Sequence, residues 1–118
     1  MGILYGCDYV INVNYYIENN TGHDIQVRYY SNKIYDSVDY LLKFNEVWHI
    51  DGRRVPLPNK KKGGSSFERD KRFTFGRMWW DNFKLNKNIN KEDYWKAVSL
   101  SEKDFKYILT LDTTYFSN

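Results

Sequence analysis

The stretch Tyr9–Glu18 reads Tyr-Val-Ile-Asn-Val-Asn-Tyr-Tyr-Ile-Glu and decides the fold. Every second residue of this stretch is apolar, and this set consists of Tyr9, Ile11, Val13, Tyr15 and Ile17. Strict period two over a whole segment is typical of a β-strand with one buried face. We therefore predict a strand here, with this set facing the core.

A second strand follows a short connection. Residues 19–22, Asn-Asn-Thr-Gly, are types that tolerate a positive φ, as a tight turn requires. Beyond them Ile25, Val27 and Tyr29 alternate with more polar residues. We expect the two strands to pair antiparallel, although a sandwich also allows them to lie in opposite sheets.

The middle of the chain is ambiguous between helix and strand. Residues 33–44 fit a helical face, but at period two Val38, Tyr40, Leu42 and Phe44 make an inward strand face equally well. We favour two short strands, the second at residues 47–50 and ended by Asp51-Gly52, because Asp-Gly is a strong turn signal.

The second half of the chain contains further strand signals. Phe73 and Phe75 mark one strand, which continues to Met78-Trp79-Trp80 and a turn at Asp81-Asn82. Residues 91–98 fit one or two helical turns, and 105–111 alternate again as a closing strand. Residues 53–71 contain Gly, Ser, Pro and Lys, a composition that indicates a long mobile loop without a packed element.

Length and composition are those of one folded domain. The chain has 118 residues, of which 42% are hydrophobic and 19% aromatic, enough to build a core. The single cysteine excludes an internal disulfide, and no run of about 18 apolar residues marks a membrane-spanning helix. Strands spaced this closely predict an all-β fold, a single antiparallel β-sandwich of about seven or eight short strands.

Positive charge is concentrated in one part of the chain. Residues 53–77 carry 9 basic and 2 acidic groups, whereas the whole chain has a net charge of +3. The basic groups we expect at an anionic surface are Lys60, Lys61, Lys62, Arg53 and Arg54. They fit an anionic polymer or lipid surface, with an ordinary solvated loop as the alternative.

Adjacent tryptophans indicate a second candidate site. Neighbouring strand residues point to opposite faces, so one of Trp79 and Trp80 should face away from the core. With Trp48 and Tyr30 they are the aromatic residues we expect to bind a sugar ring or a partner protein. The alternative is a tryptophan that only covers a sheet edge.

Catalytic and metal sites find little support. His23 lies beside a turn and His49 within a strand, and neither has a nucleophile and an orienting group in a recognisable pattern. Carboxylates near turns are expected there as solvated turn formers, so a two-carboxylate hydrolase is only a third hypothesis. No clustered set of ligands predicts a metal, and we expect no cofactor.

The N-terminal residues Leu4-Tyr5-Gly6-Cys7 resemble the end of a bacterial lipoprotein signal. The chain as a whole is similar to small lipoproteins of Bacteroidetes. The similarity also includes Asn19-Asn20-Thr21 at the first turn, Trp80-Asp81-Asn82, and the closing Phe105–Thr110 strand. Many of these proteins are immunoglobulin-like sandwiches.

This resemblance implies an immunoglobulin-like fold and a cell-envelope location, periplasmic or surface-exposed. Cys7 would be the lipid anchor, residues 1–7 the remnant of the signal, and residues 8–118 the single sandwich domain. The alternative is a short N-terminal strand with an ordinary buried cysteine.

We therefore expect a non-enzymatic envelope lipoprotein domain that binds a protein or glycan partner through exposed aromatic residues. The alternative is a soluble basic module that contacts an anionic polymer or lipid surface through residues 53–77. We do not expect nucleic acid as a partner, and the membrane is reached by the lipid anchor only.

Overall fold

Nine strands in two sheets make up most of the described chain. The computed structural model describes residues 10–31, 36–56, 67 and 71–118. The strands are β1 (Val10–Asn19), β2 (Ile25–Ser31), β3 (Ser37–Leu42), β4 (Val47–Pro56), β5 (Phe73–Trp80), β6 (Phe83–Leu85), β7 (Lys96–Ser101), β8 (Asp104–Leu111) and β9 (Phe116–Ser117). The predicted all-β sandwich is confirmed.

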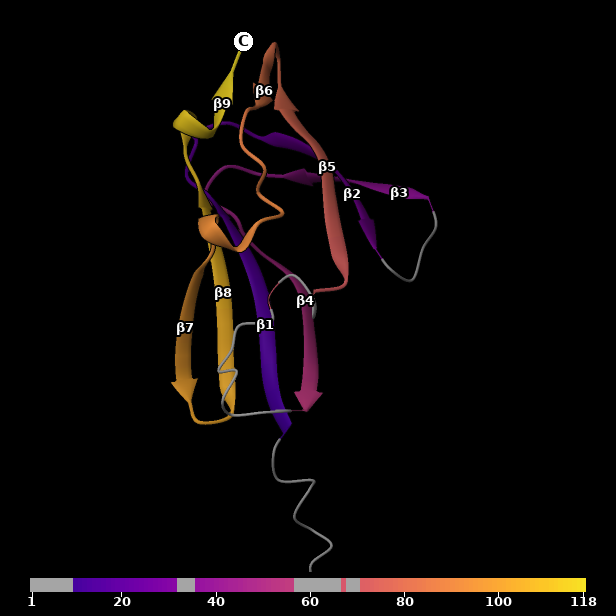
Figure 1. Cartoon of the computed structure of the whole chain (residues 1–118). Coiled ribbons are helices and arrows are strands. Elements are labelled where there is room, and N and C mark those ends of the chain that lie inside the picture. Colours follow the sequence, from indigo (N-terminus) through magenta and orange to yellow (C-terminus); the bar gives the residue numbers. More distant parts are fainter. Residues whose placement is uncertain (1–9, 32–35, 57–66, 68–70) are drawn as a thin grey trace, which may run out of the picture.

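The first sheet has the order β4-β1-β8-β7, and Figure 1 shows its four strands side by side. β1 pairs antiparallel with β4 and parallel with β8, so Tyr15 lies between Asp51 and Tyr107. The second sheet has the order β3-β2-β5-β6-β9 and is antiparallel throughout. The expected pairing of β1 with β2 is therefore wrong, because β4 and β8 occupy both edges of β1.

The core lies between the sheets and is rich in aromatic rings. Val13, Tyr15 and Ile17 of β1 are at most 5% exposed, as the alternation predicts. The Tyr15 ring stacks on Tyr107 of the neighbouring β8, with ring centroids 5.5 Å apart. Phe73 of the opposite sheet meets the same Tyr15 ring edge-on at 5.2 Å. Burial of such rings supplies apolar area and favourable edge contacts together.

β4 is longer than the sequence predicts. It continues through Asp51-Gly52, which we expected to be a turn, and ends at Pro56. Gly52 lies opposite Asn14 of β1, and a Cβ at Gly52 would come within 2.4 Å of Asn14 Oδ1. Here glycine permits a close approach between two strands instead of a turn.

The predicted loop at residues 53–71 is also partly wrong. Residues 53–56 belong to β4, and Phe67 is buried in the core at 1% exposure. Phe67 meets Tyr15, Trp95 and Tyr107 through ring contacts of 5.0 to 5.8 Å. A single aromatic residue therefore packs against β1 and β8 of the first sheet and against Trp95, despite its polar surroundings in the sequence.

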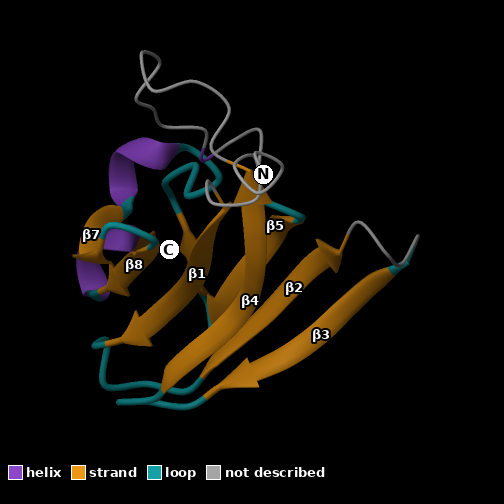
Figure 2. Cartoon of the chain, turned by 90° about the horizontal axis from the view of Figure 1, so that it is seen from below, coloured by secondary structure: helices purple, strands orange, loops and turns teal. Residues whose placement is uncertain are grey.

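The two ambiguous segments are resolved. Residues 37–42 form β3, with Leu42 fully buried, but Phe44 is 55% exposed and does not belong to the inward face. Phe44 precedes Asn45, whose φ of 64° turns the chain after β3 has ended. Residues 92–94 form one 3-10 turn that leads into β7, and Figure 2 shows the short helical turns beside β7 and β8.

Asn19 connects three segments at one end of the sandwich. It is fully buried, and its Nδ2 donates to the carbonyl oxygens of His23, Leu42 and Lys43 at 2.8 to 3.1 Å. Its Oδ1 accepts from the backbone N–H and the hydroxyl of Thr21. The buried Asn19 side chain is satisfied in this way, and it links the end of β1 to the backbone before β2 and after β3.

Candidate functional site

Of the adjacent tryptophans on β5, only Trp79 faces outward. Met78 and Trp80 are buried at 1% and 8% exposure, while Trp79 between them is partly exposed on the outer face of the second sheet. Trp80 packs on Phe116 at 4.7 Å, and the His23 ring stacks over it at 4.6 Å. Strand alternation alone produces this division.

Two of the four predicted aromatic binding residues are core residues. Trp48 is 9% exposed and stacks on Tyr40 with ring centroids 4.1 Å apart, and Trp80 is buried as described. The prediction that they contact a partner is corrected, because their rings fill the space between the sheets. The structure leaves Trp79 and Tyr30 on the surface, both on the outer face of the second sheet.

Two guanidinium groups lie over the Trp79 ring. Cζ of Arg77 is 4.8 Å and Cζ of Arg28 is 5.9 Å from the ring centroid. Both distances fall within the range of cation–π attraction. The register of β2 and β5 places Arg28 directly opposite Arg77, so two like charges are neighbours on this face.

Asp39 of β3 offsets one of these charges. Its carboxylate accepts from Nε of Arg28 at 2.9 Å and from Nη2 at 3.3 Å, a bidentate arrangement. This hydrogen bond lowers the pKa of Asp39 below its usual value and raises the pKa of Arg28. Arg28 is thereby held beside the indole, while Arg77 adds positive charge to the same face.

Tyr30 completes the face further along the strands. Its side chain is 43% exposed and lies over Gly76, where an added Cβ would come within 3.1 Å of the ring. Gly76 is the extra residue of a bulge, since β2 pairs Arg28 with Arg77 and Tyr29 with Phe75. We call the surface of Gln26, Arg28, Tyr30, Arg77 and Trp79 the Trp79 face.

The Trp79 face combines apolar rings with fixed hydrogen-bond donors. Aromatic rings offer a flat apolar surface, and guanidinium groups offer several N–H donors in a plane. A sugar ring has complementary chemistry, with an apolar C–H face and hydroxyl groups at its rim. The face is therefore suited to binding, and its residues Trp79, Arg28 and Arg77 provide no nucleophile.

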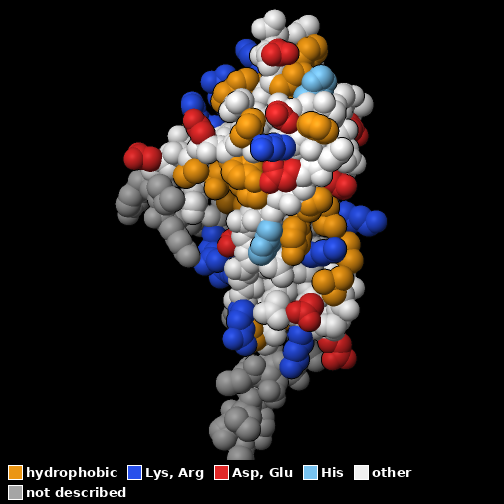
Figure 3. All heavy atoms as spheres, turned by 180° about the vertical axis from the view of Figure 1, so that it is seen from behind, with side chains coloured by type: hydrophobic (Ala, Val, Ile, Leu, Met, Phe, Trp, Pro, Cys, Tyr) orange, Lys and Arg blue, Asp and Glu red, His pale blue; other side chains and the backbone are white. Residues whose placement is uncertain are grey.

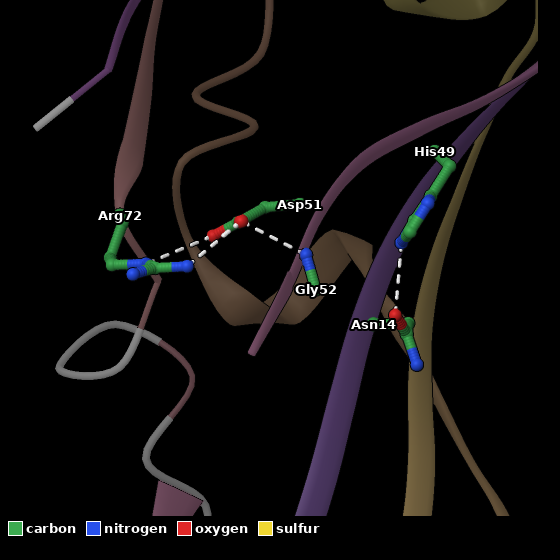
Figure 4. Close-up of polar contacts among 5 residues, drawn as sticks. All are labelled: Asn14, His49, Asp51, Gly52 and Arg72. Atoms are coloured by element: carbon green, nitrogen blue, oxygen red, sulfur yellow. Dashed lines mark hydrogen bonds and ion pairs between the residues drawn. The ribbon is translucent and has the colours of Figure 1, made fainter. Parts of the chain in front are cut away.

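A hollow on the outer face of the first sheet is a second candidate site. It has a volume of about 430 Å³, and the residues that line it are polar except for one glycine: Asn12, Asn14, His49, Gly52, Arg53, Arg54 and Asp104. Sequence reasoning missed Asn12 and Asn14, although they are the polar half of the alternation in β1. Figure 4 shows Asn14, His49 and Gly52 of this hollow at close range.

The polar groups of this hollow pair with one another. Nε2 of His49 lies 2.9 Å from Oδ1 of Asn14, and because an amide oxygen only accepts, the imidazole donates. Asp104 accepts from Asn12 and from Ser101, both at 2.9 Å, and these hydrogen bonds lower the pKa of Asp104. The lining residues include no serine, threonine or cysteine nucleophile for His49 to activate.

The predicted basic surface is dispersed in the described part of the chain. Arg53 and Arg54 are neighbours on β4 and point to opposite faces of the first sheet. Arg72 forms an ion pair with Asp51 at 3.1 Å, which Figure 4 shows, and Arg77 lies across the molecule on the Trp79 face. Lys60, Lys61 and Lys62 lie outside the described residues, as does Cys7.

Charge on the rear of the molecule is mixed. Figure 3 shows acidic and basic side chains interspersed there, with hydrophobic patches between them. No group of three potential metal ligands occurs among the residues that the structure describes. In the same part of the chain, no helix has the length and apolar character needed to cross a membrane.

Comparisons with protein-family models, with curated proteins and with solved structures found no match to this chain. The geometry of the two outer faces is therefore the basis for a functional proposal.

Proposed function

We propose that this domain is a non-catalytic glycan-binding module that uses the Trp79 face. The observation that carries the proposal is an outward tryptophan flanked by Arg77 and Arg28, whose guanidinium carbons lie 4.8 and 5.9 Å from the ring centroid. Such a ring is held in place before the ligand arrives, which reduces the entropic cost of binding. Tyr30 on the same face supplies a second exposed ring.

A glycan explains the face better than a protein partner does. Protein hot spots lie in the centre of a broad contact area from which water is excluded. The partly exposed ring of Trp79 and the exposed ring of Tyr30 share their face with the charged groups of Arg28, Arg77 and Asp39. Separate rings with polar groups between them correspond to sugar rings bearing hydroxyl groups.

A lipid tether at the cell envelope is part of the proposal and comes from the sequence. Cys7 precedes the first residue of β1, Val10, by three positions, and the preceding Leu4-Tyr5-Gly6 resembles a lipidation signal. Acyl chains on this cysteine would anchor the domain at a membrane surface. Mass spectrometry of the protein isolated from its own host tests this, and an unmodified Cys7 contradicts it.

Affinity electrophoresis tests the glycan proposal. Gels that contain one soluble polysaccharide each, covering neutral and acidic polymers, should retard the wild-type protein in at least one gel. Trp79→Ala should lose most of this retardation, since it removes the flat apolar surface on which a sugar ring would pack. Trp79 lies on the outer face of the sheet and outside the core, so the variant should keep its fold, which circular dichroism checks.

Phe44→Ala is the matched control. Phe44 is 55% exposed and lies in the β3–β4 turn, and it is not one of the residues of the Trp79 face, so its removal deletes an aromatic ring that the proposal does not use. It should migrate like the wild type in every gel. If no polysaccharide retards the wild type, or if both variants lose retardation equally, the Trp79 face is not a glycan site. Retention of a protein partner that depends on Trp79 would favour protein binding instead.

A further inference from the structure

A slot lies at the edge of β5, next to the Trp79 face. β6 pairs with β5 only at Trp79 opposite Lys84 and at Trp80 opposite Phe83. Residues 86–90 follow β6, and Figure 1 shows the chain after β6 passing beside β5. This segment contacts β5 again at Asn90, which bonds to Phe75. The part of the β5 edge in between faces a slot of about 270 Å³.

Asn90 closes the far end of the slot. Its Oδ1 accepts from the backbone N–H of Phe75 at 2.8 Å, and its Nδ2 donates to the carbonyl oxygen of Phe75 at 3.0 Å. The side chain of Asn90 thus takes the place of a paired strand residue at this point. The slot is bounded by strand pairing at one end and by this side chain at the other.

The lining of the slot is positive and contains no carboxylate. Its residues are Phe75, Gly76, Arg77, Met78, Lys84, Leu85, Lys87, Asn88, Ile89 and Asn90. Arg77, Lys84 and Lys87 are cationic, and none of the lining residues is Asp or Glu. The hollow on the first sheet differs, because Asp104 is among its lining residues. An anionic group is therefore favoured in the slot by charge.

The slot is continuous with the proposed glycan site. Arg77 lines the slot, and its guanidinium carbon also lies 4.8 Å from the centroid of the Trp79 ring. Lys84 lines the slot as well and is the cross-strand partner of Trp79. A ligand whose ring contacts Trp79 can consequently place a charged substituent between Arg77 and Lys84.

We propose that the slot binds the carboxylate of a uronic acid residue, so that the ligand of the Trp79 face is an acidic glycan. This proposal rests on the proposed function and deepens it. Three cations around one small slot fit one carboxylate per sugar ring. A nucleic acid would instead require cations spaced along a track that follows successive phosphates.

Binding to uronic acid polymers of three linkage types tests the proposal: polygalacturonate, alginate and hyaluronate. Fully methyl-esterified polygalacturonate serves as the neutral counterpart, and single-stranded DNA as an unrelated polyanion. Isothermal titration at low salt should show binding to at least one uronic acid polymer. Methyl esterification should weaken binding of polygalacturonate roughly tenfold, and salt should weaken the acidic polymers because exposed charges are screened.

The double variant Lys84→Gln with Lys87→Gln removes two cations from the slot and keeps similar side-chain length. It should weaken binding of the acidic polymer roughly tenfold. The control is Lys96→Gln with Lys103→Gln, which makes the same change in net charge at two exposed positions near β7 and β8. This control should change affinity by less than about twofold, since neither lysine lines the slot and exposed charges are screened by salt.

Each outcome decides between the slot and the proposed function. Equal losses in the two lysine pairs, or full binding of the methyl ester, overturn the slot. Tighter binding of single-stranded DNA through the same lysines overturns the glycan as ligand, and no binding to any uronic acid polymer overturns the proposal outright. If Trp79→Ala loses affinity and the Lys84 and Lys87 double variant does not, the proposed function stands and the slot is not part of the site. If the lysine double variant loses affinity and Trp79→Ala does not, the slot is an anion site and the proposed role of Trp79 is wrong.

Discussion

At the residue scale, two glycines allow a side chain from a neighbouring strand to pack directly against the backbone. Gly52 leaves space for Asn14 on the first sheet, and Gly76 leaves space for the Tyr30 ring on the second. An added Cβ would lie 2.4 Å from Asn14 Oδ1 and 3.1 Å from a Tyr30 ring carbon. Neither effect is visible in the sequence, because each glycine meets a residue far from it along the chain.

Gly76→Ala should displace the Tyr30 ring and weaken glycan binding several-fold, with little loss of stability. The new methyl group meets the edge of an exposed side chain that can move, so the fold should accommodate it. Affinity is then measured for Gly76→Ala, Tyr30→Ala and the double variant. If the glycine acts through Tyr30, the two effects should not add. Additive losses would show that Gly76 contributes independently of the ring.

Tyr40 should make stability depend on pH in the alkaline range. Burial, together with a hydrogen bond to Glu46, raises the pKa of Tyr40 to about 12 from 10.0. The folded state therefore holds this proton more firmly than the unfolded chain does. The contribution is complete below pH 10 and is lost as pH rises toward 12, because the unfolded chain then binds fewer protons.

The pH dependence is checked by urea unfolding of wild type and Tyr40→Phe at pH values from 7 to 11.5. The decline of the unfolding free energy above pH 10 should be shallower in the variant, although burial also raises the pKa of Tyr115 and leaves part of the decline in place. Between pH 7 and 9 the two proteins should show the same slope. Equal slopes above pH 10 would contradict a raised pKa for Tyr40.

At the element scale, local alternation predicts where strands lie in the chain but does not predict which strands pair with one another. β1, β2 and β8 follow from period two, because each buries one face. The parallel pairing of β1 with β8 joins residues some 90 positions apart, and no local pattern encodes it. The Asp51-Gly52 turn signal was wrong for the same reason, since Asp51 pairs with Arg72 and Gly52 lies against Asn14.

The candidate site was partly predictable on the same basis. Alternation required one of Trp79 and Trp80 to face outward, but the choice depends on which residues of β5 meet β2. The burial of Trp48 follows from its stack on Tyr40 of β3, a contact made by tertiary packing. The charges around the edge slot come from segments that meet only in the folded chain, so the sequence alone did not bring Arg77 and Lys87 together.

Asn19→Ala should be strongly destabilising because Asn19 holds the ends of several elements. The change removes this donor from the carbonyl oxygens of His23, Leu42 and Lys43, of which the bond to Leu42 is buried and the other two are partly buried. Loss of such a buried node should cost about 2–4 kcal/mol of unfolding free energy. The measurement is equilibrium urea unfolding followed by tryptophan fluorescence.

Two further variants sharpen this prediction. Asn19→Asp keeps the shape but replaces the donor by a carboxylate that faces carbonyl oxygens, so it should destabilise at least as much as alanine. Asn20→Asp is the control, because Asn20 is exposed and only its backbone N–H bonds to Leu111. It should change stability by less than about 0.5 kcal/mol. Wild-type stability in Asn19→Asp would mean that the Asn19 side chain does not donate.

At the scale of the whole molecule, the sandwich is held together by a continuous aromatic cluster across both sheets. Tyr15 and Tyr107 come from the first sheet and Phe73 from the second, and Trp95 lies 6.4 Å from Tyr15 by ring centroids. Phe67 joins this cluster from a stretch that looks like a loop in the sequence. Most aromatic rings among the described residues thus belong to the interior or pack against it.

Phe67→Ala should therefore cost the whole molecule about 3–5 kcal/mol, the usual range for removing a buried phenylalanine. This is a large share of a total stability of roughly 5–15 kcal/mol. Phe44→Ala deletes the same ring at 55% exposure instead of 1% and should cost less than about 0.5 kcal/mol. Urea unfolding followed by fluorescence measures both variants, and Trp95, 5.2 Å from Phe67 by ring centroids, reports on the cluster directly. If the two variants lose equal stability, Phe67 does not pack between the sheets, and the core closes without it.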